Sequence, residues 1–191
     1  MDKIQISKER KVITYSDFWR TAGYLLEQGQ KDKKGSYPMF LASLVFNSFS
    51  LEAFLNHIGE HIFESWYDLE TLSPKAKVNI ICEKLEIPIN YGITPWQIVP
   101  EIIGFRNKVA HGKNAMLKEE KVVPKDDKYE EIVHEFLFAD WQNYATEKNA
   151  NKVRTELEKL FGIIHKEAKI EGDFLFHHGT QIGSTSIVGN K

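Results

Sequence analysis

Cysteine is almost absent from this chain of 191 residues, because Cys82 is its only one. A single cysteine excludes an intramolecular disulfide framework and a zinc site built from cysteines, and it suits a reducing cytosol. A strong charge excess is missing as well, since 25 basic residues stand against 27 acidic ones and leave a formal net charge of −2. Attraction of the whole molecule to nucleic acid is therefore excluded, and any such binding needs a local patch.

Long apolar runs and phosphate-binding loops are also lacking. No stretch approaches the roughly 20 apolar residues of a membrane helix, and the first residues contain no apolar signal-peptide core. We therefore expect a soluble, cytoplasmic protein with no membrane contact. No G-x-x-x-x-G-K-[ST] or G-x-G-x-x-G string occurs, so nucleotide hydrolysis and dinucleotide chemistry have no support. No cofactor is expected.

The residues that are present are typical of a globular domain, with 42% hydrophobic, 12% aromatic and 27% charged positions. The apolar residues recur at helical spacing almost everywhere, and no strand pattern is convincing. The sequence therefore predicts an all-α fold, an antiparallel helical bundle of five to six helices. A single domain is expected over residues 1–172. The Gly/Ser-rich tail, residues 173–191, is expected to be mobile or to pack as an irregular strand.

The periodicity, together with cap, proline and glycine signals, places six helices. Their approximate ranges are 16–28, 39–64, 74–87, 94–111, 129–146 and 150–171, with a charged loop at 113–127. Ser16 is expected to cap the first helix, and Ser73 followed by Pro74 to start the third. In the fourth, Pro100 either kinks the helix or marks its true start. Gly112 is expected to close that helix in the left-handed conformation.

The fourth helix carries the string Phe105-Arg106-Asn107-Lys108-Val109-Ala110-His111-Gly112. An arginine, a polar residue directly after it and a histidine after four intervening residues resemble the R-x4-6-H signature of the HEPN superfamily. The setting is similar too, because the motif ends one helix of a predicted bundle. An upstream apolar helix with Glu52 and Asn56 resembles the Glu- and Asn-bearing helix of many HEPN domains. The resemblance covers most of residues 14–171 in architecture and a short stretch in motif.

Arg106 and His111 have the chemistry that RNA cleavage without a metal requires. Histidine titrates near ~6.5 and serves as base or acid at neutral pH. Arginine stays charged and offers a planar fork of donors to phosphate oxygens. The pair suffices for attack by the RNA 2′-hydroxyl, which leaves a 2′,3′-cyclic phosphate and a 5′-hydroxyl. The HEPN resemblance implies the same metal-independent endoribonuclease activity, in a toxin–antitoxin or anti-phage defence role. The alternative is a non-catalytic α-helical module for protein interaction or nucleotide binding.

The spacing of the motif raises the question of how the two side chains meet. Five steps along an ideal helix leave Arg106 and His111 roughly 140° apart. A left-handed Gly112 would let both groups line one cleft. The HEPN resemblance implies that a second copy completes this cleft, so we expect a homodimer. It also allows a partner antitoxin protein, although Lys113 stands where antitoxin-partnered members often carry a modifiable tyrosine.

A basic stretch surrounds the motif. Between Ile102 and Lys118 there are no acidic residues, and the basic ones are Arg106, Lys108, Lys113 and Lys118. The three lysines are therefore candidates for RNA binding. The alternative is a solvated helix end, where the helix dipole favours cations.

Glu52 and Asn56 lie four residues apart on an otherwise apolar helix. Their polar stripe either faces water or, as favoured here for Glu52, holds a buried carboxylate that orients Arg106 or His111. The catalytic candidates are thus Arg106, His111 and Glu52, with Asn107 and Asn56 in support.

The remaining histidines and Cys82 give weaker signals. His57 and His61 have the i, i+4 spacing of metal ligands on a helix, yet no third ligand is evident. A solvent-facing pair is favoured, and His177-His178 in the tail has the same weakness. No metal site is predicted. Cys82 is expected to be a small core residue rather than a nucleophile.

Overall fold

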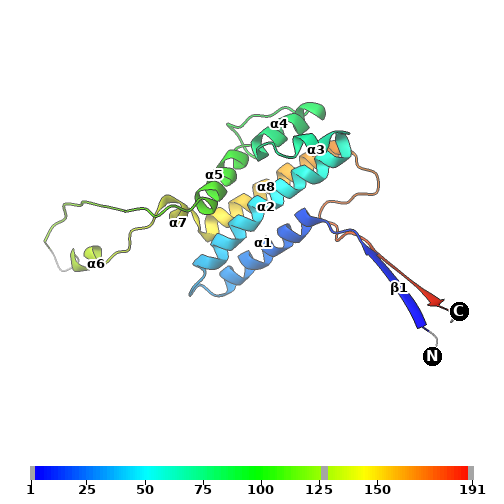
Figure 1. The fold of residues 1–191 in the computed structure, drawn as a ribbon. Helices are drawn as coiled ribbons and strands as arrows, with labels where there is room; N and C mark the ends of the chain where they lie inside the picture. Colours follow the sequence, from blue (N-terminus) through cyan, green and yellow to red (C-terminus); the bar gives the residue numbers. More distant parts are fainter. Residues whose placement is uncertain (1–2, 126–128, 189–191) are drawn as a thin grey trace.

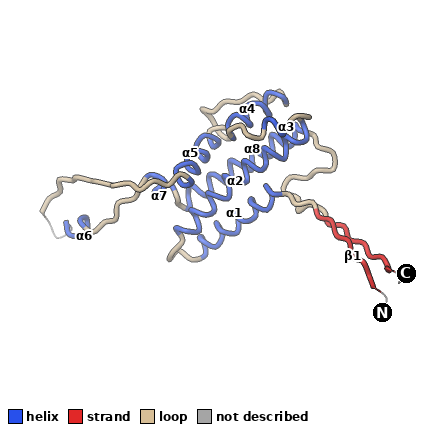
Figure 2. Tube along the Cα trace, viewed as in Figure 1, coloured by secondary structure: helices blue, strands red, loops and turns tan. Residues whose placement is uncertain are grey.

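The computed structural model describes residues 3–125 and 129–188 of the chain. These residues are mostly helical, as predicted, and they include a two-stranded sheet that the sequence analysis does not predict (Figure 2). The elements in chain order are β1 (Lys3–Arg10), α1 (Thr14–Lys31), α2 (Tyr37–Ile62), α3 (Trp66–Leu69), α4 (Pro74–Lys84), α5 (Ile98–Ala110), α6 (Tyr129–Val133), α7 (Asp140–Tyr144), α8 (Glu147–Ala168) and β2 (Gln181–Val188). The ends of the predicted charged loop and of the predicted tail, 126–127 and 189–191, lie outside the described residues.

Helix α2 lies at the centre of the helical body. Helices α1 and α8 run alongside it, and α4 and α5 pack against it elsewhere (Figure 1). Its fully buried apolar side chains are Leu44, Leu51, Phe54, Leu55 and Ile58. Full burial of each such side chain contributes about 1.5–3 kcal/mol. Helix α2 is therefore the central helix, with neighbours on several sides.

Helix α2 also has the length and composition of a membrane span, with a hydropathy of 1.4 over its most apolar window. The sequence analysis expects no such stretch. Half of that window is buried by the rest of the protein, and the core helix of a soluble protein has the same properties. The fold is compatible with a soluble protein.

The helix ends differ from the predicted ends at two of the three cap positions. Ser73 does cap α4, because its side chain accepts a hydrogen bond from the Ala76 amide. Ser16 does not cap α1: Ile13 is the N-cap residue, and Ser16 is buried within the first turn. Packing of Ile13 into the core, where it is 4% exposed, starts the helix earlier than its polar residues indicate.

At the end of α5, the predicted left-handed glycine is wrong. His111 is the C-cap residue, with φ −96° and ψ 24°, and its amide still donates to the Asn107 carbonyl at 3.0 Å. Gly112 is not among the glycines with positive φ. The start of α5 at Ile98 places Pro100 in the first helical turn, so Pro100 does not kink the helix.

The helix predicted at 129–146 is wrong. Only the short helices α6 and α7 form among its described residues, and residues 112–125 and 129–139 belong to an arm that extends from the end of α5 (Figure 1). Apolar side chains of the arm remain exposed, including Val133 at 72% and Phe136 at 86%. The helical spacing of these residues has no packing partner in the body, and a short helix without tertiary packing is marginal in water.

The tail also differs from its prediction. Residues 181–188 form a regular strand, β2, which pairs antiparallel with β1 from Lys3↔Val188 to Arg10↔Gln181. The segment before it packs on the helical body: Phe176 stacks on Trp19 at a centroid distance of 4.7 Å. The Phe176 amide donates to the Tyr15 hydroxyl. The two ends of the described chain thus meet in one ribbon (Figure 2).

Candidate functional site

Arg106 is held by Glu52 at the junction of α5 and α2. Its Nη2 donates a hydrogen bond to Glu52 Oε2 at 2.8 Å, which makes an ion pair between the motif helix and the central helix. The Glu52 side chain is 36% exposed and that of Arg106 is 23% exposed. Glu52 is therefore not the buried carboxylate that the sequence analysis favours. It does contact Arg106, and a guanidinium fixed in this way keeps other donors available for a phosphate.

Lys77 is a member of this cluster that the sequence analysis missed. The residue belongs to α4 and is 1% exposed, yet it carries an ammonium group. Its Nζ donates to Asn56 Oδ1 at 2.8 Å and lies 3.9 Å from Glu52 Oε1. A buried ammonium requires such partners. Asn56 therefore acts through Lys77, and this contact replaces the direct support of the motif that we expect from its sequence position.

The sequence contains one signal that could have identified Lys77. Lys77 precedes Ile81 by four residues, and Ile81 is fully buried on the same helix. Residues at i and i+4 share a helix face. A lysine on a core face indicates a buried partner of opposite polarity. The surrounding lysines, Lys75 and Lys84, obscure this signal because charged residues near helix ends are usually solvated.

His111 lies apart from Arg106 within one chain. It is exposed and lines a hollow of about 480 Å³ at the root of the arm, together with Lys108, Lys113 and Trp141. No contact within the described residues joins Arg106 to His111. The helix continues regularly up to His111, so the angular separation of the two positions is not corrected by a left-handed turn.

The predicted basic residues are on the surface at this end of α5. Asn107, Lys108, Lys113 and Lys118 are all exposed, and Lys108 makes an exposed ion pair with Asp140 at 3.3 Å. Exposed pairs of this kind contribute about 0–1 kcal/mol and are screened by salt. The lysines are therefore accessible to a polyanion.

A second hollow, of about 370 Å³, opens beside Glu52. Thr14, Phe18, Phe49 and Asn56 contribute to its lining. Phe18, Phe46 and Phe49 form an aromatic cluster there, with ring centroids 5.9–6.2 Å apart. Phe49 is 39% exposed. Aromatic rings at a surface stack on bases or pack against a partner protein.

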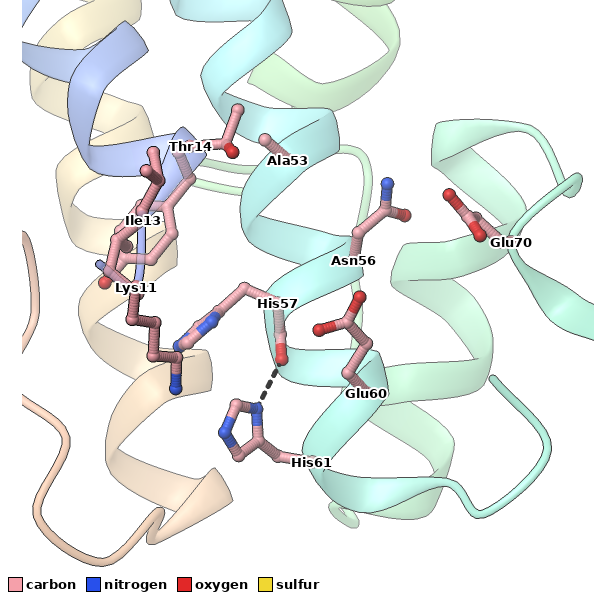
Figure 3. A pocket seen from close by; sticks show the side chains of 11 residues that line it. Lys11, Ile13, Thr14, Ala53, Asn56, His57, Glu60, His61 and Glu70 are labelled. Carbon is pink, nitrogen blue, oxygen red and sulfur yellow. Dashed lines mark hydrogen bonds between the residues drawn. The ribbon is translucent and has the colours of Figure 1, made fainter. Parts of the chain in front are cut away.

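Of the His57–His61 pair, His61 is exposed as expected, but His57 is not. His61 Nδ1 lies 2.7 Å from the His57 carbonyl, and Figure 3 shows the His57 ring pointing away from Glu60. His57 Nε2 makes a 2.8 Å hydrogen bond with Asp173, and the side chain is only 10% exposed. The hollow beside it, of about 300 Å³, is lined by Lys11, Glu60 and Glu70 among others.

Comparisons of the chain with protein-family models, with curated proteins and with solved structures find no match. The class that the fold defines is a mostly helical protein with a small sheet. The HEPN resemblance rests on the R-x4-H string and its companion helix, and it stays a prediction.

Proposed function

We propose that this protein is a HEPN-like, metal-independent endoribonuclease that acts as a homodimer. The observation that carries the proposal is the 2.8 Å ion pair between Arg106 and Glu52. The pair links the R-x4-H helix to the Glu-bearing helix, as expected if Glu52 orients Arg106. If the R-x4-H string occurred by chance on a surface helix, this ion pair would not be expected.

Each group has a role in the proposed reaction. His111 takes the proton from the RNA 2′-hydroxyl, and the 2′-oxygen attacks the adjacent phosphorus. The bond from phosphorus to the 5′-oxygen breaks, and the leaving oxygen receives a proton from a second imidazole. Arg106 stabilises the negative charge that gathers on the phosphate, and Glu52 holds the guanidinium in place. The products are a 2′,3′-cyclic phosphate and a 5′-hydroxyl.

The dimer follows from two features of a single chain. One motif supplies one histidine, whereas the reaction uses a base and an acid. In addition, Arg106 and His111 have different surroundings within a chain, so a complete site needs groups from two motifs. A two-fold pair of α5 helices meets both needs with one symmetric contact. The exposed Phe49 beside Glu52 provides apolar surface for such a contact.

RNA is the proposed substrate because the exposed Lys108, Lys113 and Lys118 offer cations near the motif. A cytoplasmic toxin or phage-defence role, with a possible antitoxin partner, follows from the HEPN resemblance alone. The motif does not support neutralisation by modification at Lys113.

A non-catalytic interaction module is the second candidate. It is favoured by the exposed apolar side chains of the two protruding segments, among them Ile4, Ile182, Val122 and Phe136. Exposed apolar surface of this kind is typical of contacts with a partner protein.

Incubation of the purified protein with RNA and EDTA, beside a His111→Ala variant, decides between the two. We expect the wild type to cleave RNA and leave cyclic-phosphate ends, and the variant to be inactive. The folded fraction is followed by circular dichroism in the same buffers. Cleavage that survives the substitution contradicts the mechanism, as does activity that EDTA abolishes while the fold is retained. No cleavage by the wild type favours the interaction module.

A further inference from the structure

Four side chains far apart in the sequence converge near the C-terminal end of α2. His57 belongs to α2, His165 to α8, and Asp173 and His177 to the segment between α8 and β2. The Nε2 atoms of His57, His165 and His177 lie 2.8, 3.4 and 2.6 Å from the carboxylate oxygens of Asp173. Three imidazoles therefore surround one carboxylate.

The cluster is shielded from solvent and incompletely hydrogen bonded. The Asp173 side chain is 7% exposed, and the Nε2 atoms of His165 and His177 are buried. Neither of these two nitrogens makes a hydrogen bond of normal geometry with any residue that the structure describes. Buried polar atoms without partners are rare and costly. His177 Nε2 lies 2.6 Å from Asp173 Oδ1 without normal hydrogen-bond geometry, which leaves this nitrogen available to an ion that it shares with the carboxylate.

We propose that His57, His177 and Asp173 bind one Zn²⁺ ion, with His165 beside the site. Imidazole nitrogen and carboxylate oxygen are both ordinary zinc ligands, with bonds of about 2.0–2.2 Å. A tetrahedron of such bonds has edges of about 3.4 Å. The Nε2 atoms of His57 and His177 lie 2.8 and 2.6 Å from Asp173, so the ligands must move apart slightly to admit the ion. The ligand atoms of all three residues lie within 4.8 Å of one another. Three protein ligands leave the fourth position of the tetrahedron to a water molecule.

The hydrogen bonds around His177 are compatible with a metal at its Nε2. Zinc bound at His177 Nε2 places the ring proton on Nδ1. Nδ1 then no longer accepts the 3.3 Å hydrogen bond from the Gly179 amide, which is a small loss.

The ion would fasten the segment at 169–180 to α2. This segment leads directly into β2, and its other described anchors are the stacking of Phe176 on Trp19 and the hydrogen bond from Phe176 to Tyr15. Because β2 pairs with β1, fixing the segment also fixes the base of the sheet. The site has a structural role and is independent of the proposed RNA cleavage.

The test uses the full chain without a histidine tag. We expect about one zinc per chain by elemental analysis, and cobalt substitution to give the visible absorption of a four-coordinate site. At zinc about 100-fold above its Kd, the melting temperature should rise by about 5–10 °C over the metal-free protein. Chelation should also increase proteolytic cleavage within 169–180, because the segment loses its main constraint.

Variants separate a built site from adventitious binding. His177→Gln and His57→Gln should each lower zinc affinity by at least about tenfold. His178→Gln is the matched control, since His178 is exposed and lies next to His177; it should bind zinc as the wild type does. Wild-type protein that takes up no zinc when titrated overturns the proposal, and so does uptake that both cluster variants leave unchanged. If a variant fails to fold, the zinc content of the wild-type protein alone decides whether the site exists. RNA cleavage is not measured, so the failure of the proposed nuclease activity would not affect this test.

Discussion

Arg106 and Glu52 join α5 to α2 through a 2.8 Å ion pair, and the other Glu52 oxygen lies 3.9 Å from the buried ammonium of Lys77. One carboxylate therefore serves two cations from two different helices. Lys77 is almost completely buried, whereas Arg106 is partly exposed. Loss of the carboxylate should affect Lys77 more, because a buried charge has no water to replace its partner.

This relationship predicts non-additive effects on stability. Glu52→Gln should lower the free energy of unfolding by about 1–3 kcal/mol, because it leaves Lys77 with only Asn56 as a partner. Adding Lys77→Met to Glu52→Gln should restore part of this loss, since the uncompensated ammonium is removed. Urea unfolding of the wild type, both single variants and the double variant measures the coupling. Strictly additive losses would mean that Glu52 and Lys77 do not interact.

A second prediction compares Arg106 with Lys108, which differ in role. If Arg106 clamps the phosphate, Arg106→Lys should lower kcat by about 10²–10³-fold although the charge is kept, because a point charge cannot replace the planar guanidinium. Lys108→Ala should leave kcat nearly unchanged and reduce the salt dependence of RNA binding by a slope of about 1. Single-turnover cleavage and binding at several salt concentrations measure both. Equal losses in kcat would assign Arg106 to a general basic patch.

Elements with strong local signals could be predicted from the sequence. The apolar density of α2 and the Ser73-Pro74 start of α4 are such signals, and both elements form where expected. The failures share a physical cause, which is that tertiary partners are not visible in local spacing. The arm region keeps a helical pattern without a surface to pack on, and β1 finds its partner at the opposite end of the chain.

The candidate site was also predictable only where local sequence patterns, rather than tertiary packing, determine the contacts. The contact of Arg106 with Glu52 could be predicted, because both residue types belong to a recognisable pattern on two helices. Lys77 has only the weak signal of its i, i+4 spacing from Ile81, because its burial depends on how α4 docks on α2. Of the histidine–aspartate cluster, the sequence analysis singles out His57 and His177, each as part of a histidine pair, but not His165 or Asp173. Packing of α8 on α2 brings His165 close, and the return of the chain after α8 brings Asp173 and His177 to His57.

A third prediction concerns the shared site. If both His111 side chains of a dimer are needed, a wild-type chain paired with a His111→Ala chain is inactive. Refolding the wild type with about a nine-fold excess of the variant should therefore lower the activity per wild-type chain to about one tenth. Mixing the two proteins immediately before the assay, without time for exchange, is the control and should change nothing. Undiminished activity after verified exchange would show that one chain suffices.

The last prediction uses Cys82, which is fully buried on α4 and whose thiol pKa is raised by burial to about 12. A thiol-specific reagent at pH 8 should therefore label the folded protein far more slowly than the chain in denaturant, which should react once per chain. Below pH 9 the thiol is protonated in both states. Between about 9 and 12 only the unfolded chain ionises, so Cys82 should lower the free energy of unfolding by about 1.4 kcal/mol per pH unit. Urea unfolding of the wild type and Cys82→Ala at several pH values isolates this effect from other titrating groups. Rapid labelling of the folded protein, or a wild-type-to-variant difference that does not change above pH 9, would show that Cys82 is accessible to water.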